Sequence, residues 1–182
     1  MHFAPDTIES LDAAVALCNT AAAASRSRTE ELADVDALLA LLDRFRYSGR
    51  RDRDEPERLE VLATRARLRA LWRLTRDDAA AEVNTMLADA RAMPFLIRHD
   101  GYDWHLHATS LDAPLAERIR VETAMALLDV IRDDEWERLR ECAAPDCDGV
   151  FTDFSRNGSK RFCSVRCGNR VNQVLFRERG RG

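Results

Sequence analysis

Four of the five cysteines lie within 26 residues near the C-terminal end of the chain. They form two close pairs, Cys142 with Cys147 and Cys163 with Cys167, and fifteen residues separate the pairs. This spacing is typical of a structural zinc site, because one segment folds onto the other and completes a tetrahedron of thiolates. Since cysteine fills all four positions, the site has no place for a catalytic water. The sequence predicts one structural Zn²⁺ bound by these four residues.

Two disulfide bonds are the alternative use of this spacing. The first residues, MHFAPDTIES, have neither the basic nor the apolar region of a secretory signal. No apolar run is long enough to span a bilayer, so no membrane partner is expected. We expect a cytoplasmic protein, and stable disulfides are rare in that compartment. The fifth cysteine, Cys18, lies on an apolar helical stripe and is expected to be a small core residue.

The charge of the chain is unevenly distributed around these cysteines. Residues 154–182 carry eight basic side chains and one acidic side chain, a local net charge of +7. Because the whole chain has a net charge of −4, residues 1–153 carry −11. A basic arm on an acidic body usually binds a polyanion. A biased base composition would explain the preference for arginine over lysine, but not the scarcity of acids after residue 153.

The basic residues follow a helical pattern in residues 165–179, which Ser164 is expected to cap. Arginine, asparagine and glutamine are the side chains that contact base edges in two places, and arginine also binds phosphates. Duplex DNA is therefore the expected partner, and the alternative is a solvated polar face. The predicted DNA-binding residues are Arg156, Lys160, Arg161, Arg166, Asn169, Arg170, Gln173 and Arg177. The opposite, inward side is expected to carry Cys167, Val171, Val174 and Leu175.

The segment between the two cysteine pairs, GVFTDFSRNGSKRF, is predicted to form a strand, an Asn157–Gly158 turn and a second strand. Such a hairpin would return the second cysteine pair to the first. With a helix carrying the last ligands in its first turn, the arrangement resembles a treble clef.

The first two thirds of the chain are predicted to be mainly helical. Apolar residues recur at helical spacing over residues 7–22, 33–45, 56–74, 77–92 and 111–133. Asp54 and Glu57 have the spacing of a capping box at the start of the third helix. The predicted fold is mainly α, with a helical domain over residues 1–137 and a four-cysteine zinc finger over residues 138–182. We expect a fragment ending near residue 134 to fold alone.

One short β element interrupts these helices. Asp100–Gly101 lies between two alternating segments, which predicts a hairpin. His105 and His107 would then face the same side of a strand, with His99 across the hairpin. A second metal site is conceivable there, but histidine on an exposed strand face is the commoner case.

The C-terminal stretch RECAAPDCDGVFTDFSRNGSKRFCSVRCGNR resembles the CGNR zinc finger, named for the tetrapeptide that is Cys167–Arg170 here. The resemblance covers residues 138–179. In that family the finger follows a helical ABATE domain, which LCNT and HATSLDAPLAERIRVETAMALLD resemble. The resemblance implies a stress-induced bacterial transcription regulator whose finger binds zinc and DNA.

Nothing in the sequence indicates an enzyme, because no nucleophile–base pair, phosphate loop or paired-carboxylate motif stands out. In a regulator, the helical domain is the natural place for a small-molecule effector or a homodimer contact. Asn19 and Thr20 interrupt an apolar helix, and they could line such a pocket or make a hydrogen bond at the helix end. The alternative function is a zinc-stabilised protein-interaction module that does not bind DNA.

Overall fold

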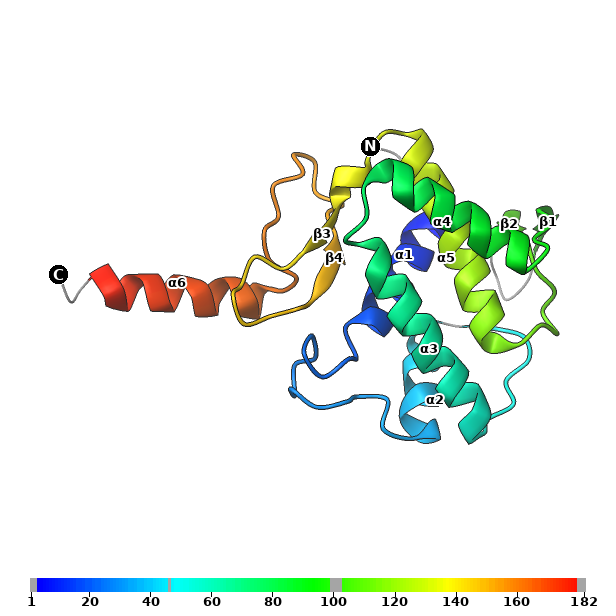
Figure 1. The fold of residues 1–182 in the computed structure, drawn as a ribbon, viewed down its shortest axis with the longest axis horizontal. Coiled ribbons are helices and arrows are strands. Elements are labelled where there is room, and N and C mark those ends of the chain that lie inside the picture. The colour runs from blue at the N-terminus through cyan, green and yellow to red at the C-terminus, as the bar shows by residue number, and fades with distance from the viewer. Residues whose placement is uncertain (1–2, 46, 99–102, 180–182) are drawn as a thin grey trace.

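The computed structural model describes residues 3–45, 47–98 and 103–179 (Figure 1). These ranges hold six α-helices and two small antiparallel sheets, so the predicted mainly-α fold is confirmed. The helices are α1 (Pro5–Cys18), α2 (Val35–Arg44), α3 (Glu55–Leu71), α4 (Arg76–Asp89), α5 (Leu115–Arg132) and α6 (Val165–Arg179). The strands are β1 (Phe95–Ile97), β2 (His105–His107), β3 (Leu139–Glu141) and β4 (Val150–Thr152), and a 3-10 turn, Trp136–Arg138, precedes β3.

The predicted capping box opens α3. The Asp54 side chain accepts a hydrogen bond from the backbone N–H of Glu57 at 2.9 Å. In return, the Glu57 carboxylate accepts the backbone N–H groups of Asp52 and Arg53, each at 2.9 Å. The bond to Asp54 satisfies a donor that a helix start leaves unpaired and fixes the start of α3, while the bonds to Glu57 hold the backbone of the preceding loop.

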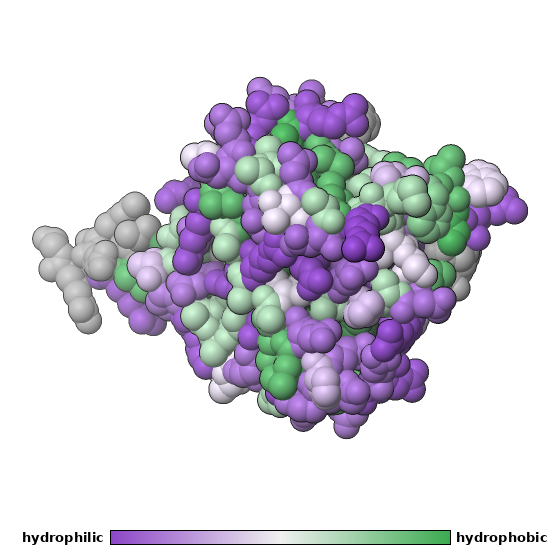
Figure 2. Space-filling model, turned by 45° about the vertical axis from the view of Figure 1, so that its right-hand side comes forward, coloured by the Kyte–Doolittle hydropathy of each residue, from purple (hydrophilic) through white to green (hydrophobic). Residues whose placement is uncertain are grey.

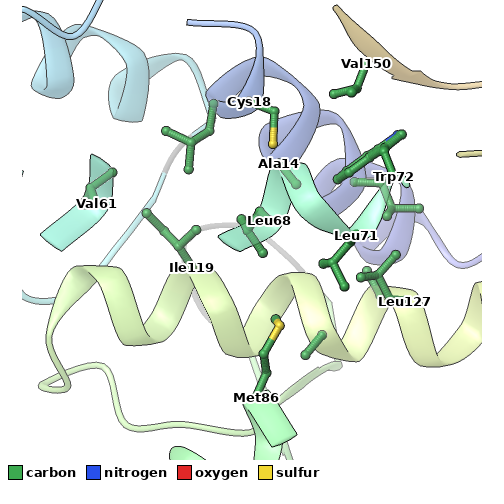
Figure 3. Close-up of a cluster of buried hydrophobic side chains, with 14 of the residues drawn as sticks. Ala14, Cys18, Val61, Leu68, Leu71, Trp72, Met86, Ile119, Leu127 and Val150 are labelled. Carbon is green, nitrogen blue, oxygen red and sulfur yellow. The ribbon is translucent and has the colours of Figure 1, made fainter. Parts of the chain in front are cut away.

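The body of the molecule is built around α5, which packs against α1, α3 and α4. The apolar stripes of these helices meet in one core, where Cys18, Leu68 and Leu127 are fully buried (Figure 3). Cys18 is therefore a core residue, as its position on the stripe predicted. Burial also raises the pKa of its thiol to about 12, so it stays protonated near neutral pH.

The core of the body continues into the β3–β4 hairpin. Leu139 and Val150 belong to the same apolar cluster as the helices, and Val150 lies on the strand at the upper right of Figure 3. The side-chain amide of Asn19, which follows α1, donates to the Val150 carbonyl and accepts the Val150 N–H, both at 2.8 Å. The indole N–H of Trp72 donates to the Phe151 carbonyl at 3.2 Å. The first strands of the finger are thus bonded directly to the body.

The second hairpin pairs β1 with β2, with Leu96 opposite Leu106. This confirms the predicted strands, while the predicted Asp100–Gly101 turn lies outside the described residues. Figure 2 shows hydrophobic residues on the right-hand side of the molecule, at the end of the body where Figure 1 places the β1–β2 hairpin. The exposed large hydrophobic residues of this region are Met93, Phe95, Leu96, Trp104 and Leu106. Among the described helices, none is long and apolar enough to cross a membrane.

Candidate metal centre and basic helix

The four predicted zinc ligands come together at one end of the β3–β4 hairpin. The sulfur atoms of Cys142, Cys147, Cys163 and Cys167 all lie within 4.8 Å of one another. Three of the distances, those joining Cys147, Cys163 and Cys167, are each 3.7 Å. A tetrahedral zinc with bonds of about 2.3 Å to sulfur requires S···S edges of about 3.8 Å, whereas a disulfide requires about 2.05 Å. The four free thiols fit one structural Zn²⁺ and not two disulfides.

The ligands are positioned by local structure on both sides of the centre. Cys142 directly follows β3 and Cys147 lies in the loop before β4, while Cys163 precedes α6 and Cys167 lies in its first turn. The hydroxyl oxygen of Ser164 accepts the Cys167 N–H at 3.2 Å, so Ser164 caps α6 as predicted. The cap places the last two sulfurs on the same end of the helix.

Backbone N–H groups point at two of the sulfurs. Gly149 donates to the Cys147 sulfur and Cys163 donates to the Cys142 sulfur, each at 3.4 Å. Such donors stabilise thiolates and orient them toward a metal. The pKa of the Cys163 thiol is raised well above its usual range. Burial is the largest cause, and the neighbouring Cys142 thiol is the second. A cation among the four sulfurs would favour the thiolate form of Cys163.

Gly149 leaves room for the sulfurs. A Cβ atom at this position would lie 2.9 Å from the Cys163 sulfur and 3.2 Å from the Cys147 sulfur. Gly149→Ala is expected to weaken zinc binding by roughly tenfold or more, as changes around metal ligands commonly do. Competition with a chromogenic chelator measures the affinity. Ser159→Ala, an exposed change on the neighbouring loop, is the control and should leave it unchanged; an unaltered affinity for Gly149→Ala would contradict the expectation.

The predicted strand pairing within the finger is wrong. Residues 149–162 do not form a hairpin: β4 pairs with β3, with Arg140 opposite Phe151, and the residues after the Asn157–Gly158 turn are not a strand. The physical reason is Asp153, which is fully buried. Its carboxylate accepts the N–H of Ser155 at 2.9 Å and the N–H of Lys160 at 2.7 Å. These bonds use the backbone donors that a second strand would need.

Arg170 of the CGNR tetrapeptide supports the metal centre. Its guanidinium donates to the Asp146 carboxylate at 2.6 Å and lies 3.8 Å from the Cys167 sulfur. Asp146 also forms an ion pair with Arg28 of the body at 3.2 Å. A positive charge beside a zinc tetrathiolate, which carries a net charge of about −2, stabilises it. The contacts of Arg170 are thus with the chain itself.

The other predicted DNA-binding residues are placed differently. Arg166 donates to the backbone carbonyl of Arg26 at 3.3 Å, across to the body. Lys160 lies over the ring of Phe151 at 5.1 Å, and Arg161 lies over the ring of Phe162 at 5.6 Å. The exposed members of the predicted set are Arg156, Lys160, Arg161, Arg166, Asn169, Gln173 and Arg177.

Beyond its first two turns, α6 projects away from the body (Figure 1). A shallow depression on its outer side is lined by Asn169, Asn172, Gln173, Phe176 and Arg177.

The prediction of which α6 residues face inward is only partly correct. Cys167 is buried and Val171 packs against it, but Val174 is 49% exposed because no part of the described body reaches that turn. The side chain of Leu175 lies outside the described part of the structure.

Several residues of this region make contacts that the sequence does not predict. Asn19 bonds the body to β4, Asp146 joins Arg170 to Arg28, and Asp153 organises the loop after β4. Thr20 has the simpler of its two predicted roles, since its hydroxyl donates to the Leu17 carbonyl at 2.7 Å. The position of Asp146 between Cys142 and Cys147 could have indicated a role at the metal centre. Asn19 lies far in sequence from its partner Val150, so the sequence does not indicate their contact.

The two described histidines of β2 face the same side, as the alternation predicted. The Nε2 atoms of His105 and His107 lie 3.1 Å apart, and His107 is buried rather than exposed. Within the described ranges, the four cysteines are the only group of three or more metal-binding side chains that could hold an ion. His99 lies outside those ranges.

Comparison with protein families agrees with this division of the chain. The model of the CGNR zinc finger matches residues 138–180. The model of the ABATE family, described as "Putative stress-induced transcription regulator", matches residues 11–134. A search of the curated proteins found no match. The two family matches follow the helical body and the four-cysteine centre in order, and the chain therefore belongs to the ABATE family and carries a CGNR zinc finger after its helical domain.

Proposed function

We propose that this protein is a cytoplasmic bacterial transcription regulator that binds duplex DNA through its zinc finger. The helical domain, which we place at residues 1–137, would sense an effector or form a dimer contact, and residues 138–182 would contact DNA. The observation that carries the proposal is the course of α6, which leaves the body with Asn169, Gln173 and Arg177 exposed on its outer side.

The dimensions and chemistry of α6 suit a major groove. A helix is about 10–12 Å wide with its side chains, and the groove is about 12 Å wide. Arginine contacts guanine in two places, and asparagine and glutamine do the same with adenine. DNA phosphates would repel the acidic body. The protein would therefore approach DNA with its basic finger facing the duplex.

The salt dependence of binding tests this proposal. If the exposed cations Arg156, Lys160, Arg161 and Arg177 neutralise about four phosphates, log affinity should fall with log salt at a slope of about −3 to −4. Arg177→Ala is expected to weaken binding and to reduce that slope by about one. Arg177 lies far along α6 from the thiolates, so its loss leaves the zinc centre intact. Fluorescence anisotropy with a labelled random duplex gives both quantities.

Arg44→Ala is the matched control, because it removes one exposed charge from α2 of the body. It should change neither the affinity nor the slope. A single finger offers a small interface, so strong sequence preference requires a dimer that presents two fingers. A DNA affinity that changes neither with salt concentration nor with Arg177→Ala would overturn the proposal.

A second function has its own supporting observation. Phe176 is 79% exposed and Val174 is 49% exposed on the projecting helix. Apolar side chains on a helix with no partner are typical of a surface that packs against another protein. The absence of DNA binding by the zinc-loaded protein would favour this protein-interaction function.

A further inference from the structure

The helical body contains a cavity of about 210 Å³ between α1, α5 and β2. Its walls come from the first half of α1, the second half of α5, the segment after α2, and β2. Phe45, Met125 and Leu128 provide apolar surface, and the hydroxyl-bearing side chain of Tyr47 lies among them. At about 30 Å³ for each water, the volume equals about seven waters, or a ligand of roughly ten non-hydrogen atoms. This is the size of a small metabolite.

The charges on the described walls are mainly negative. Four carboxylates, those of Asp6, Glu9, Glu122 and Asp129, line the cavity, and Arg132 is the one arginine among the described lining residues. Thr7 donates its hydroxyl to the Asp129 carboxylate at 2.6 Å. A partly open cavity whose walls carry an excess of carboxylates attracts a cation.

Glu122 is the wall residue that a cation would affect most. Burial raises its pKa to about 7, against the opposing influence of Arg118, Tyr47 and His105, while Glu9 adds to the increase. The Tyr47 hydroxyl bonds to this carboxyl group, and burial raises the pKa of Tyr47 as well. The ionised form of Glu122 therefore lacks full compensation, and a bound cation would supply it.

Arg118 does not supply that compensation through direct bonds. It is almost fully buried, and its Nε donates to the Ala113 carbonyl at 3.1 Å. Its two terminal nitrogens donate to the carbonyls of Ser48 and Arg50. The guanidinium thus holds the loop around residue 49 in place, and it is not among the residues that line the cavity.

We propose that this cavity binds a small organic cation: an amine of roughly ten non-hydrogen atoms with one apolar group. The ammonium would lie against the carboxylates near Glu122, and the apolar group would contact Phe45, Met125 and Leu128. Aromatic faces such as those of Phe45 and Tyr47 also favour cations. This inference deepens the effector role proposed above and rests on it for its biological meaning, but binding itself does not depend on DNA.

The position of the cavity also relates it to the finger. Asp6, Thr7 and Glu9 lie on the first half of α1, and the same helix leads to Asn19, which bonds Val150 of β4. A shift of α1 caused by a ligand would reach the β3–β4 hairpin through this side chain. The ligand-bound and free forms would then differ in how they hold the metal centre and α6.

Calorimetric titration of the full, zinc-loaded chain tests the inference. The probes are 2-phenylethylamine, cyclohexylmethylamine and hexylamine, each paired with the alcohol of the same skeleton. At least one amine is expected to bind tenfold or more tightly than its alcohol. Its affinity should rise from pH 6 to pH 8, because the pKa of Glu122 is raised to about 7 and its carboxyl group loses its proton in that range. Equal binding of amines and alcohols, or no binding of any amine, would overturn the proposal.

Two variants locate the site. Glu122→Gln is expected to weaken amine binding at least tenfold, and Asp6→Asn at the start of α1 should weaken it as well. Glu60→Gln, on the exposed side of α3, is the matched control and should bind as the parent does. Zinc content and circular dichroism of each variant report whether it is folded. If Glu122→Gln does not fold, the Asp6→Asn variant tests the location of the site. Unchanged amine binding by Asp6→Asn would then overturn the proposed site.

DNA binding is measured on the same samples. A protein that binds an amine but not DNA supports this cavity and contradicts the proposed function. A protein that binds DNA but no amine contradicts the cavity and supports the finger. The two proposals therefore fail separately.

Discussion

Replacing Cys163 with serine is expected to abolish stoichiometric zinc binding and to unfold α6 with the loops that precede it. The apolar cluster around the metal centre is small: its buried members are Cys142, Ala144 and Cys167. So little apolar surface cannot offset the chain entropy of these segments. In small zinc fingers the metal contributes about 10–16 kcal/mol of binding free energy, which is also folding free energy.

Cys18→Ala is the matched control, because Cys18 is buried in the core of the body and is not a ligand. It should keep one zinc per chain, as measured by elemental analysis. A chelator added to the parent protein should reproduce the Cys163→Ser result, seen as lost helical signal in circular dichroism. A zinc-free protein whose α6 amides remain protected from hydrogen exchange would contradict this prediction.

A fragment ending at residue 134 is expected to be far less stable than the intact chain, in contrast to the independence that the helical pattern suggested. It lacks Leu139 and Val150, which are buried in the core of the body, and the hydrogen bond from Trp72. Two such side chains contribute about 1.5–3 kcal/mol each, and each lost hydrogen bond adds about 1 kcal/mol. The expected loss of about 5 kcal/mol is comparable with the whole stability of many domains.

A fragment ending at residue 154 separates the hairpin from the metal. It retains β3, β4 and the bonds of Asn19, but lacks Cys163 and Cys167. Urea denaturation should show that this longer fragment unfolds at a much higher denaturant concentration than the fragment ending at residue 134. Equal midpoints would show that the hairpin contributes nothing to the body. If the longer fragment is the more stable one, the β3–β4 hairpin belongs to the body, and a loss of zinc unfolds only α6 and the loops that precede it.

The features that the sequence alone determined are those whose causes lie within a few residues. The helices of the body follow from apolar residues at helical spacing, and the start of α3 follows from Asp54 and Glu57. The metal centre follows from the donor chemistry of two cysteine pairs, because four cysteines at this spacing are typical of a structural zinc site. The cap by Ser164 is equally local.

Only the tertiary structure decided which segments pair and which charges remain exposed. Strand pairing depends on competition for backbone donors, and Asp153 took those of residues 155 and 160, so that β4 paired with β3. Two arginines on the same helical stripe have different surroundings: Arg170 donates to the Asp146 carboxylate, whereas Arg177 is exposed to solvent. Contacts between residues far apart in sequence leave no periodic signal, which is why the bond between Asn19 and Val150 became visible only in the folded chain.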